Sequence, residues 1–207
     1  MKYFFLSLIL TFCVSTQSEG QNAEVKTILF FGDSITAGLG VDKDQAFPAL
    51  IQDRIDSLGM KYEVINGGLS GETSAGGLRR IDWVLQRKID VMILELGGND
   101  GLRGIDLSST KENLQQIIDK VESTYPEVQI ILAGMQVPPN LGQEYTRQFQ
   151  EIYPSLAEKN DLPLIPTIMN KLGGSEQFMQ SDGLHPTSKG HELIAETIWD
   201  KLKPIFM

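Results

Sequence analysis

Short apolar runs alternate with longer segments of helical spacing from residue 27 to the end of the chain. Several runs are apolar at every position, as in Val91-Met92-Ile93-Leu94, which is typical of strands in a parallel sheet covered on both faces. Parallel neighbours need crossover helices, so the pattern predicts one α/β domain with three layers over residues 27–207. The five predicted strands cover residues 27–31, 62–66, 91–96, 128–133 and 162–165.

Two of the intervening segments carry clear helical patterns. Residues 109–124 form the first, where Ser109 and Glu112 predict a capping box, and residues 187–202 form the second. The apolar positions of each helix share one face: Leu114, Ile117, Ile118 and Val121 in the first, and Ile194, Ile198 and Leu202 in the second.

In sheets of this kind, ligands bind outside the carboxyl ends of the strands, so the segments that follow strands are where chemistry is expected.

The composition of the chain argues against several classes of function and site. The 207 residues include 18 Lys+Arg and 27 Asp+Glu, a net charge of −9, which argues against binding nucleic acid or an anionic membrane by charge. Cys13 is the one cysteine, so the sequence excludes an internal disulfide and a thiolate-rich metal cluster. The chain has only two histidines for acid–base work, and we expect His191, which has polar neighbours in the last helix, to lie on the surface.

The first 26 residues have the pattern of an export signal followed by a short polar tether. Lys2 precedes an apolar run over residues 3–14, too short for the ~18–20 residues that span a bilayer. The sequence therefore predicts an exported protein, periplasmic or secreted, although a buried strand or helix is the rival interpretation. Leu10-Thr11-Phe12-Cys13 loosely resembles a lipoprotein cleavage box with Cys13 as the lipid attachment site, but Phe12 departs from the small residue expected there.

Ser34 directly follows the first predicted strand, so its hydroxyl stands at a strand-to-helix turn. A serine hydroxyl is a weak nucleophile until a base removes its proton, and His185 is the candidate base. His185 lies three residues after Asp182, a spacing that lets the carboxylate accept from the imidazole and fix its tautomer. Two plainer interpretations stay open: Ser34 as an N-cap, and Asp182 with His185 as caps of the last helix.

Acyl transfer through a serine also needs donors for the oxyanion that develops on the substrate. Three candidates follow strand ends: the N–H of Ser34, the N–H of Gly71 and the side-chain amide of Asn99. Glycine permits close approach of the backbone to a ligand, and asparagine offers an uncharged donor.

Other mechanisms find little support. The sequence contains no Gly-x-Ser-x-Gly elbow, Walker loop, dinucleotide-binding glycine motif or His-Glu-x-x-His. The two histidines are six residues apart across a helix start, a poor spacing for metal ligands. A mechanism based on paired carboxylates is the remaining alternative, but nothing in the sequence separates the roles of its candidates, Asp33, Glu95, Asp100 and Asp182.

Four segments in chain order resemble the sequence blocks of the SGNH (GDSL) hydrolase superfamily, and in particular its bacterial acyl-CoA thioesterase/lysophospholipase/arylesterase branch. The resemblance runs from about residue 27 to the C-terminus, and four blocks in order are far more specific than any one. The blocks are Gly32-Asp33-Ser34, Ser70-Gly71-Glu72-Thr73, Gly97-Gly98-Asn99-Asp100 and Asp182-Gly183-Leu184-His185-Pro186.

The resemblance implies a flavodoxin-like α/β/α fold and a serine esterase that uses neither metal nor cofactor. It assigns Ser34 as nucleophile, His185 as base and then acid, and Asp182 as its orienting partner, with the oxyanion held by Ser34, Gly71 and Asn99. It further implies a mobile loop that grips the acyl chain, formed by Gly101, Leu102, Arg103 and Gly104.

We therefore expect a monomer that hydrolyses small-molecule esters or thioesters through an acyl-enzyme. Two alternatives remain at this point. One is a carbohydrate O-acetylesterase of the same superfamily, and the other is an exported binding module that keeps the fold without catalysis.

Overall fold

The computed structural model describes residues 24–137 and 141–206, so the predicted leader and Cys13 lie outside the described residues. One sheet of five parallel strands runs in the order β2-β1-β3-β4-β5. This is the strand order of a flavodoxin-like doubly wound sheet, so the predicted fold class is confirmed. The strands are β1 (Lys26–Gly32), β2 (Tyr62–Asn66), β3 (Val91–Glu95), β4 (Gln129–Ala133) and β5 (Leu164–Ile165).

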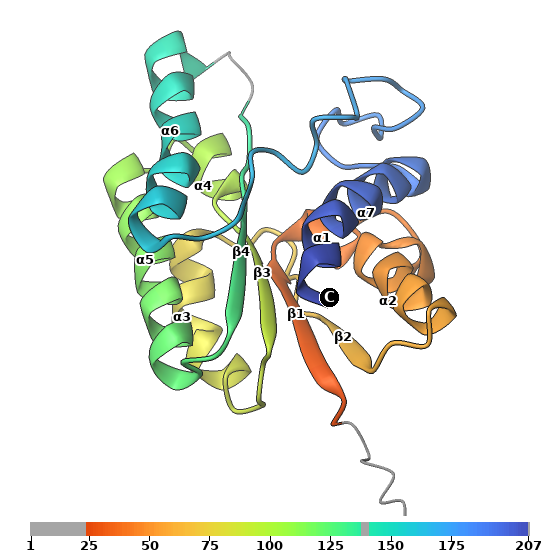
Figure 1. Cartoon of the computed structure of the whole chain (residues 1–207). Coiled ribbons are helices and arrows are strands. Elements are labelled where there is room, and N and C mark those ends of the chain that lie inside the picture. The colour runs from red at the N-terminus through yellow and green to blue at the C-terminus, as the bar shows by residue number, and fades with distance from the viewer. Residues whose placement is uncertain (1–23, 138–140, 207) are drawn as a thin grey trace, which may run out of the picture.

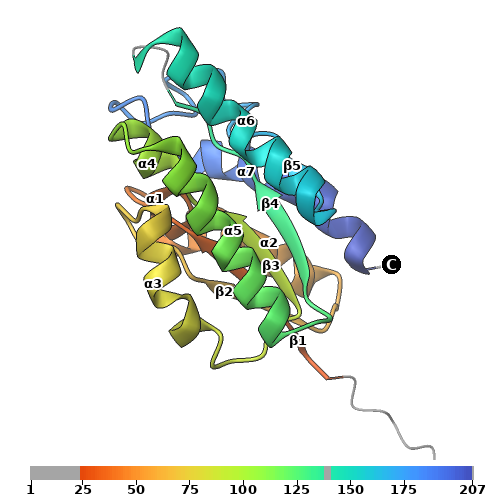
Figure 2. The same cartoon turned by 90° about the vertical axis from the view of Figure 1, so that its left-hand side faces the viewer.

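Helices cover both faces of the sheet and complete the three layers (Figure 1). The helices α2 (Phe47–Ser57) and α7 (Ser188–Leu202) pack together on one face. On the other face α5 (Leu107–Thr124) packs between α3 (Ser74–Val84) and α6 (Gln143–Asn160), as Figure 2 shows from the side. Two short helices, α1 (Ser34–Ala37) and α4 (Gly98–Leu102), follow β1 and β3 directly.

The central strands explain why the apolar runs are continuous. Every residue of β3 is buried, and so are all residues of β1 after Lys26, because helices cover both sides of these strands. Glu95 ends β3 as a fully buried acid within this apolar layer, and it lies close to the segment that carries Ser34. Among the described residues, no helix is long and apolar enough to cross a membrane.

The predicted start of α5 is wrong by two residues, and so is its predicted cap. The helix begins at Leu107, and Asp106 is the N-cap, with its carboxylate accepting from Ser109 N at 2.9 Å. Glu112 accepts from Gln116 one turn later and takes no part in the cap. An aspartate and a serine three residues apart compete for the N-cap in the sequence, and here the charged acceptor occupies it.

The prediction that His191 lies on the surface is wrong. Its side chain is fully buried on the face of α7 that packs against α2, where Nδ1 accepts from Phe47 N at 3.3 Å and the ring stacks on Phe47. Position 191 lies one turn before Ile194 and two turns before Ile198, so it belongs to the buried face that the same helix was predicted to have. Burial lowers the pKa of His191 to about 4, which keeps the ring neutral near pH 7.

Candidate active site

All four predicted blocks lie at the carboxyl ends of the strands. The helix α1 follows β1, the turn containing Gly71 follows β2, α4 follows β3, and the segment from Asp182 to His185 precedes α7 (Figure 1). The sheet order places β1 between β2 and β3, so the first three blocks are neighbours in space.

A continuous chain of hydrogen bonds joins Ser34, His185 and Asp182. His185 Nε2 lies 2.9 Å from Ser34 Oγ, and His185 Nδ1 lies 2.6 Å from Asp182 Oδ2. Ser34 and His185 are separated by about 150 residues of sequence, and it is the fold that brings them together. This is the arrangement that activates a serine hydroxyl for nucleophilic attack.

The turn that presents His185 is built by Asp182. Its other carboxylate oxygen, Oδ1, accepts from Leu184 N at 2.9 Å and from His185 N at 3.0 Å. The hydrogen bond from His185 is the main reason that the pKa of Asp182 falls to about 2. An ionised Asp182 accepts from the Nδ1–H of the ring, which leaves the lone pair of Nε2 facing the Ser34 hydroxyl.

The turn that presents Ser34 is capped by the residue before it. Asp33 is the N-cap of α1, and its Oδ1 accepts from Ile35 N at 3.0 Å. The plainer interpretation of Ser34 as an N-cap is therefore wrong. Ser34 is the first residue of the helix, and its hydroxyl bonds His185.

The Asn99 amide links the segments that carry the other two oxyanion candidates, Ser34 and Gly71. The Asn99 amide donates to Glu72 O at 3.0 Å and to Asp33 Oδ2 at 3.1 Å, so it contacts the residue next to Gly71 and the residue next to Ser34. Within residues 24–137 and 141–206, the N–H groups of Gly71 and Ser34 have no hydrogen-bond partner. Both N–H groups are thus free to donate to a ligand.

The acids that a mechanism based on paired carboxylates would use are hydrogen-bonded to other groups. Glu95 Oε2 accepts from Thr36 Oγ1 at 2.6 Å and from Asp33 N at 3.3 Å, beneath the Ser34 turn. Burial raises the pKa of Asp33 to about 6 and holds the pKa of Glu95 well above its ordinary value. Asp100 accepts from the N–H and the hydroxyl of Ser74. None of these three stands opposite another carboxylate across an open site, as that mechanism requires.

A cavity of about 410 Å³ opens beside Ser34, Asn99 and His185. Leu102 is the one residue of the predicted acyl-binding loop among those that line the cavity in the described part of the chain, and Gly101 and Leu102 belong to α4 rather than to a loop. Arg103 instead donates to Gly71 O at 3.0 Å, and Gly104 ends the segment with a positive φ of 65°. The cavity is mainly apolar, and sequence reasoning did not assign most of its apolar side chains to the site: Ile35, Met135, Val137, Met169 and Leu184.

The comparison with known families agrees with this geometry. Residues 30–193 match the model of the GDSL-like Lipase/Acylhydrolase family, which is more than half of the chain. The chain belongs to this family. It is accordingly a carboxylic ester hydrolase, and the resemblance seen in the four sequence blocks is confirmed.

Individual relatives of this GDSL-family chain are similar over nearly their whole length. Esterase TesA of Pseudomonas aeruginosa is 38% identical over 200 residues, covering 96% of this chain and 98% of that protein. Thioesterase 1/protease 1/lysophospholipase L1 of Escherichia coli is 38% identical over 184 residues, covering 88% and 86%. The structure of the psychrotrophic esterase EstA from Pseudoalteromonas, inhibited by monoethylphosphonate, matches with a TM-score of 0.82 and 33% identity, covering 86% and 97%.

Proposed function

We propose that this chain hydrolyses carboxylic esters and thioesters of apolar acyl chains through an acyl-enzyme formed on Ser34. The observation that carries the proposal is the hydrogen-bonded series Ser34–His185–Asp182, which lies at the wall of an apolar cavity. A base positioned in this way contributes about 10²–10⁴-fold to the rate.

In the first half of the reaction, Ser34 Oγ attacks the acyl carbonyl carbon while His185 Nε2 takes the hydroxyl proton. The carbonyl oxygen becomes an oxyanion, which accepts from Ser34 N, Gly71 N and the Asn99 amide. For the amide to donate, one of its two hydrogens exchanges Asp33 Oδ2 for the oxyanion. Each such donor is worth about 10²–10³ in rate.

The tetrahedral intermediate then collapses. The C–O or C–S bond to the leaving group breaks, and His185 gives its proton to the departing alcohol or thiol. A water molecule repeats the sequence on the acyl-enzyme, with His185 again acting as base, and releases the acid and free Ser34. Asp182 stabilises the imidazolium that forms in each half.

The cavity wall supports an apolar acyl group as the recognised part of the substrate. Two of its residues are methionines, Met135 and Met169, whose flexible thioethers adapt to chains of different shape. A carbohydrate acetylesterase would instead need polar groups facing the sugar beyond a small acyl pocket. We therefore place lysophospholipid, aryl ester and acyl thioester substrates ahead of acetylated polysaccharide.

A substrate panel tests the proposal. Wild-type protein, Ser34→Ala and the exposed-serine control Ser123→Ala are compared on p-nitrophenyl esters of increasing acyl length and on acetylated xylan. We expect hydrolysis by the wild type and the control, with a preference for acyl groups longer than acetyl, and only background with Ser34→Ala. Equal hydrolysis by wild type and Ser34→Ala would remove the catalytic proposal, and a preference for xylan acetyl groups would replace the substrate class.

We also propose that residues 1–26 direct export, with Cys13 as a lipid attachment site when cleavage occurs before it. The support is the sequence pattern of a positive end, a short apolar run and a polar tether. Mass spectrometry of the mature N-terminus decides among an intact leader, simple cleavage and a lipidated Cys13. Every group of the proposed mechanism comes from one chain, so a monomer is sufficient for the proposed chemistry.

A further inference from the structure

The turn after β2 carries Gly71, yet regular secondary structure holds only its beginning. Gly67 N donates to Phe30 O at 2.7 Å and Leu69 N donates to Gly32 O at 3.0 Å, which extends the pairing with β1. Beyond that point the backbone supplies one bond within the turn, from Glu72 N to Leu69 O at 3.1 Å. The position of Gly71, and of its N–H group, therefore depends on side chains that reach the turn from elsewhere. One of these is Arg103, which donates to Gly71 O at 3.0 Å.

Arg80, on α3, is the side chain that makes most of these contacts. Its Nε lies 2.8 and 2.7 Å from the two carboxylate oxygens of Glu72, and one terminal nitrogen also bonds that carboxylate. The same nitrogen donates to Gly67 O at 2.7 Å. The guanidinium carbon lies 4.0 Å from the centre of the Phe31 ring, at the end of β1. One side chain thus ties the beginning of the turn, its end and β1 together.

The partner of Arg80 is buried, so this contact is not an ordinary surface ion pair. The Glu72 side chain is only 3% exposed, against 21% for Arg80. Charge-assisted bonds to a guanidinium are strong and directional, and here solvent screens them little. Glu72 is therefore held by Arg80 through its side chain and by Leu69 through its N–H.

Glu72 connects this contact to the proposed oxyanion donors. Glu72 follows Gly71 directly in the sequence, and the carbonyl oxygen of Glu72 accepts from the Asn99 amide at 3.0 Å. A shift of Glu72 moves the Gly71 N–H and removes the acceptor that orients Asn99. Oxyanion donors work only within about 2.7–3.1 Å of the oxyanion, so a displacement near 1 Å is costly.

We propose that Arg80 is a positioning residue for catalysis, which sets the oxyanion donors Gly71 and Asn99 through Glu72. The inference rests on the proposed function, since it assumes that these donors hold an oxyanion. Arg80 touches no reacting atom, so its effect is on transition-state stabilisation and not on substrate binding.

The neighbouring Arg79 provides a matched control. It lies on the same helix with the same charge, but it is exposed and makes none of these contacts among the described residues. The test compares Arg80→Ala, Arg80→Lys, Glu72→Gln and Arg79→Ala with the wild type and a Ser34→Ala blank. For each variant we would measure kcat and KM on p-nitrophenyl butyrate, inhibition by an alkyl trifluoromethyl ketone, and thermal unfolding.

We expect Arg80→Ala to lower kcat about 10–100-fold, part of the cost of losing a full oxyanion donor, while KM stays within about 3-fold. Affinity for the ketone, whose serine adduct places an oxyanion among the same donors, falls by the same factor as kcat/KM. Arg80→Lys and Glu72→Gln keep some hydrogen bonds, so they give intermediate losses and cover the case that Arg80→Ala does not fold. Arg79→Ala behaves as the wild type.

Three results would overturn the inference: folded Arg80 and Glu72 variants with wild-type kcat, a rise in KM at unchanged kcat, or a kcat loss that ketone affinity does not follow. These are distinct from failure of the proposed function, which would show as activity in the Ser34→Ala blank. An inactive blank together with wild-type activity in the Arg80 variants removes the role of Arg80 alone.

Discussion

The two histidines of this chain occupy opposite environments. His185 stands between Asp182 and Ser34, where its ring can take up and return a proton. His191 is buried against Phe47, and its Nε2 has no hydrogen-bond partner among the described residues. A proton on His191 would be a buried charge without a counter-ion, which is why its pKa is low.

His191 should therefore make the fold sensitive to acid. The unfolded ring takes up a proton below about pH 6.5 and the folded ring only near pH 4, so the unfolded state binds more protons in this window. Stability attributable to His191 is lost as pH falls from 6.5 to 4, by about 3 kcal/mol in all. Urea unfolding of wild type and His191→Gln at pH 7 and pH 4.5 measures this, and the stability of the variant should fall less.

Three other groups must be separated from this effect. The pKa of Asp33 is raised to about 6, so its contribution has the opposite sign and is lost as pH rises from about 4 to 6. Burial also raises the pKa of Glu95, so its contribution has the same sign as that of Asp33 and is lost as pH rises above the ordinary pKa of a glutamate. The pKa of Asp182 is lowered to about 2, so its contribution is lost below about pH 4, outside the window. All three groups are present in the wild type and in the variant, so the difference in stability between the two proteins isolates His191. An equal loss of stability in both proteins would contradict the assignment.

Sequence patterns predicted the residues that take part in the reaction better than the residues that hold them in place. Ser34, Asp182 and His185 could be chosen because serine chemistry needs a base, histidines are few and the Asp–His spacing is short. The contact of His191 with Phe47 depends on how α7 packs against α2, and the pairing of Arg80 with Glu72 depends on how the turn after β2 folds back on α3. Helical spacing could have placed His191 on the buried face of α7, but it reveals the partner of neither side chain.

At the scale of elements, strands were predictable because both faces of the sheet are covered. The apolar runs place four of the five strands within one residue of their bounds, whereas β5 begins two residues later than predicted and has only two residues. The start of α5 and its cap were predicted less well. The start of α5 depended on which of two nearby polar residues, Asp106 or Ser109, accepts hydrogen bonds from the backbone N–H groups of the first turn.

The cap of α5 gives a prediction for this helix. Asp106→Ala removes the acceptor of Ser109 N, so we expect the melting temperature to fall by about 2–4 °C. Glu112→Ala, which removes the acid of the capping box expected from the sequence, serves as the control and should have little effect. Differential scanning calorimetry of the two variants decides which residue caps the helix, and a larger loss with Glu112→Ala would restore the sequence-based interpretation.

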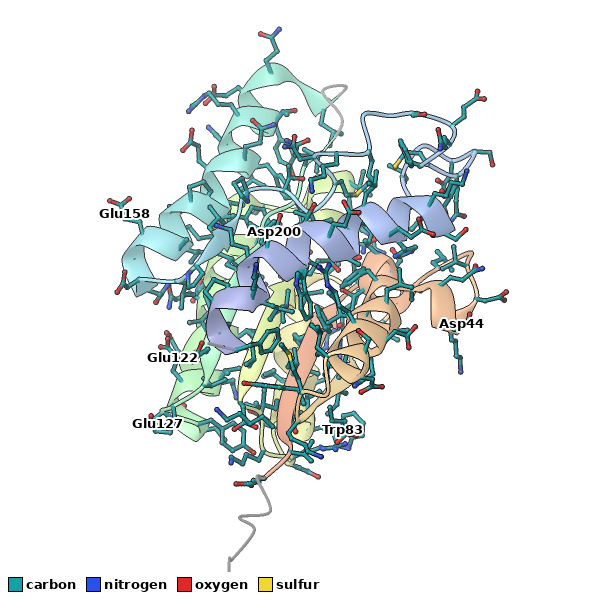
Figure 3. The ribbon with its side chains drawn as sticks, turned by 45° about the vertical axis from the view of Figure 1, so that its right-hand side comes forward. Asp44, Trp83, Glu122, Glu127, Glu158 and Asp200 are labelled. Atoms are coloured by element: carbon teal, nitrogen blue, oxygen red, sulfur yellow. The ribbon has the colours of Figure 1, made fainter. Side chains whose placement is uncertain are left out.

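At the scale of the whole molecule, negative charge is spread over the surface. Asp44, Glu122, Glu127, Glu158 and Asp200 project outward from separate elements in Figure 3, in keeping with a net charge of −9. Such a field repels anionic ligands over roughly 30 Å at 10 mM salt and about 8 Å at 150 mM. Neutral substrates do not experience this repulsion.

Ionic strength should therefore distinguish two kinds of substrate. An acyl-coenzyme A thioester carries several negative charges, so its kcat/KM should rise as salt increases from about 10 to 150 mM. A p-nitrophenyl ester of the same acyl chain should show no such rise. Steady-state rates on the two substrates, measured across that range, provide the comparison. A fall in kcat/KM for the thioester would mean that local positive charge, as on Arg103, outweighs the net field.

The central claim is that Ser34 is a nucleophile activated by His185, and covalent labelling tests it most directly. A fluorophosphonate probe forms a bond between Ser34 Oγ and phosphorus with loss of fluoride, and peptide mass spectrometry locates the adduct. We predict one adduct per chain on the peptide that contains Ser34, none in Ser34→Ala and slow labelling in His185→Ala. Folded wild-type protein that remains unlabelled, or that is labelled at another residue, would contradict the account.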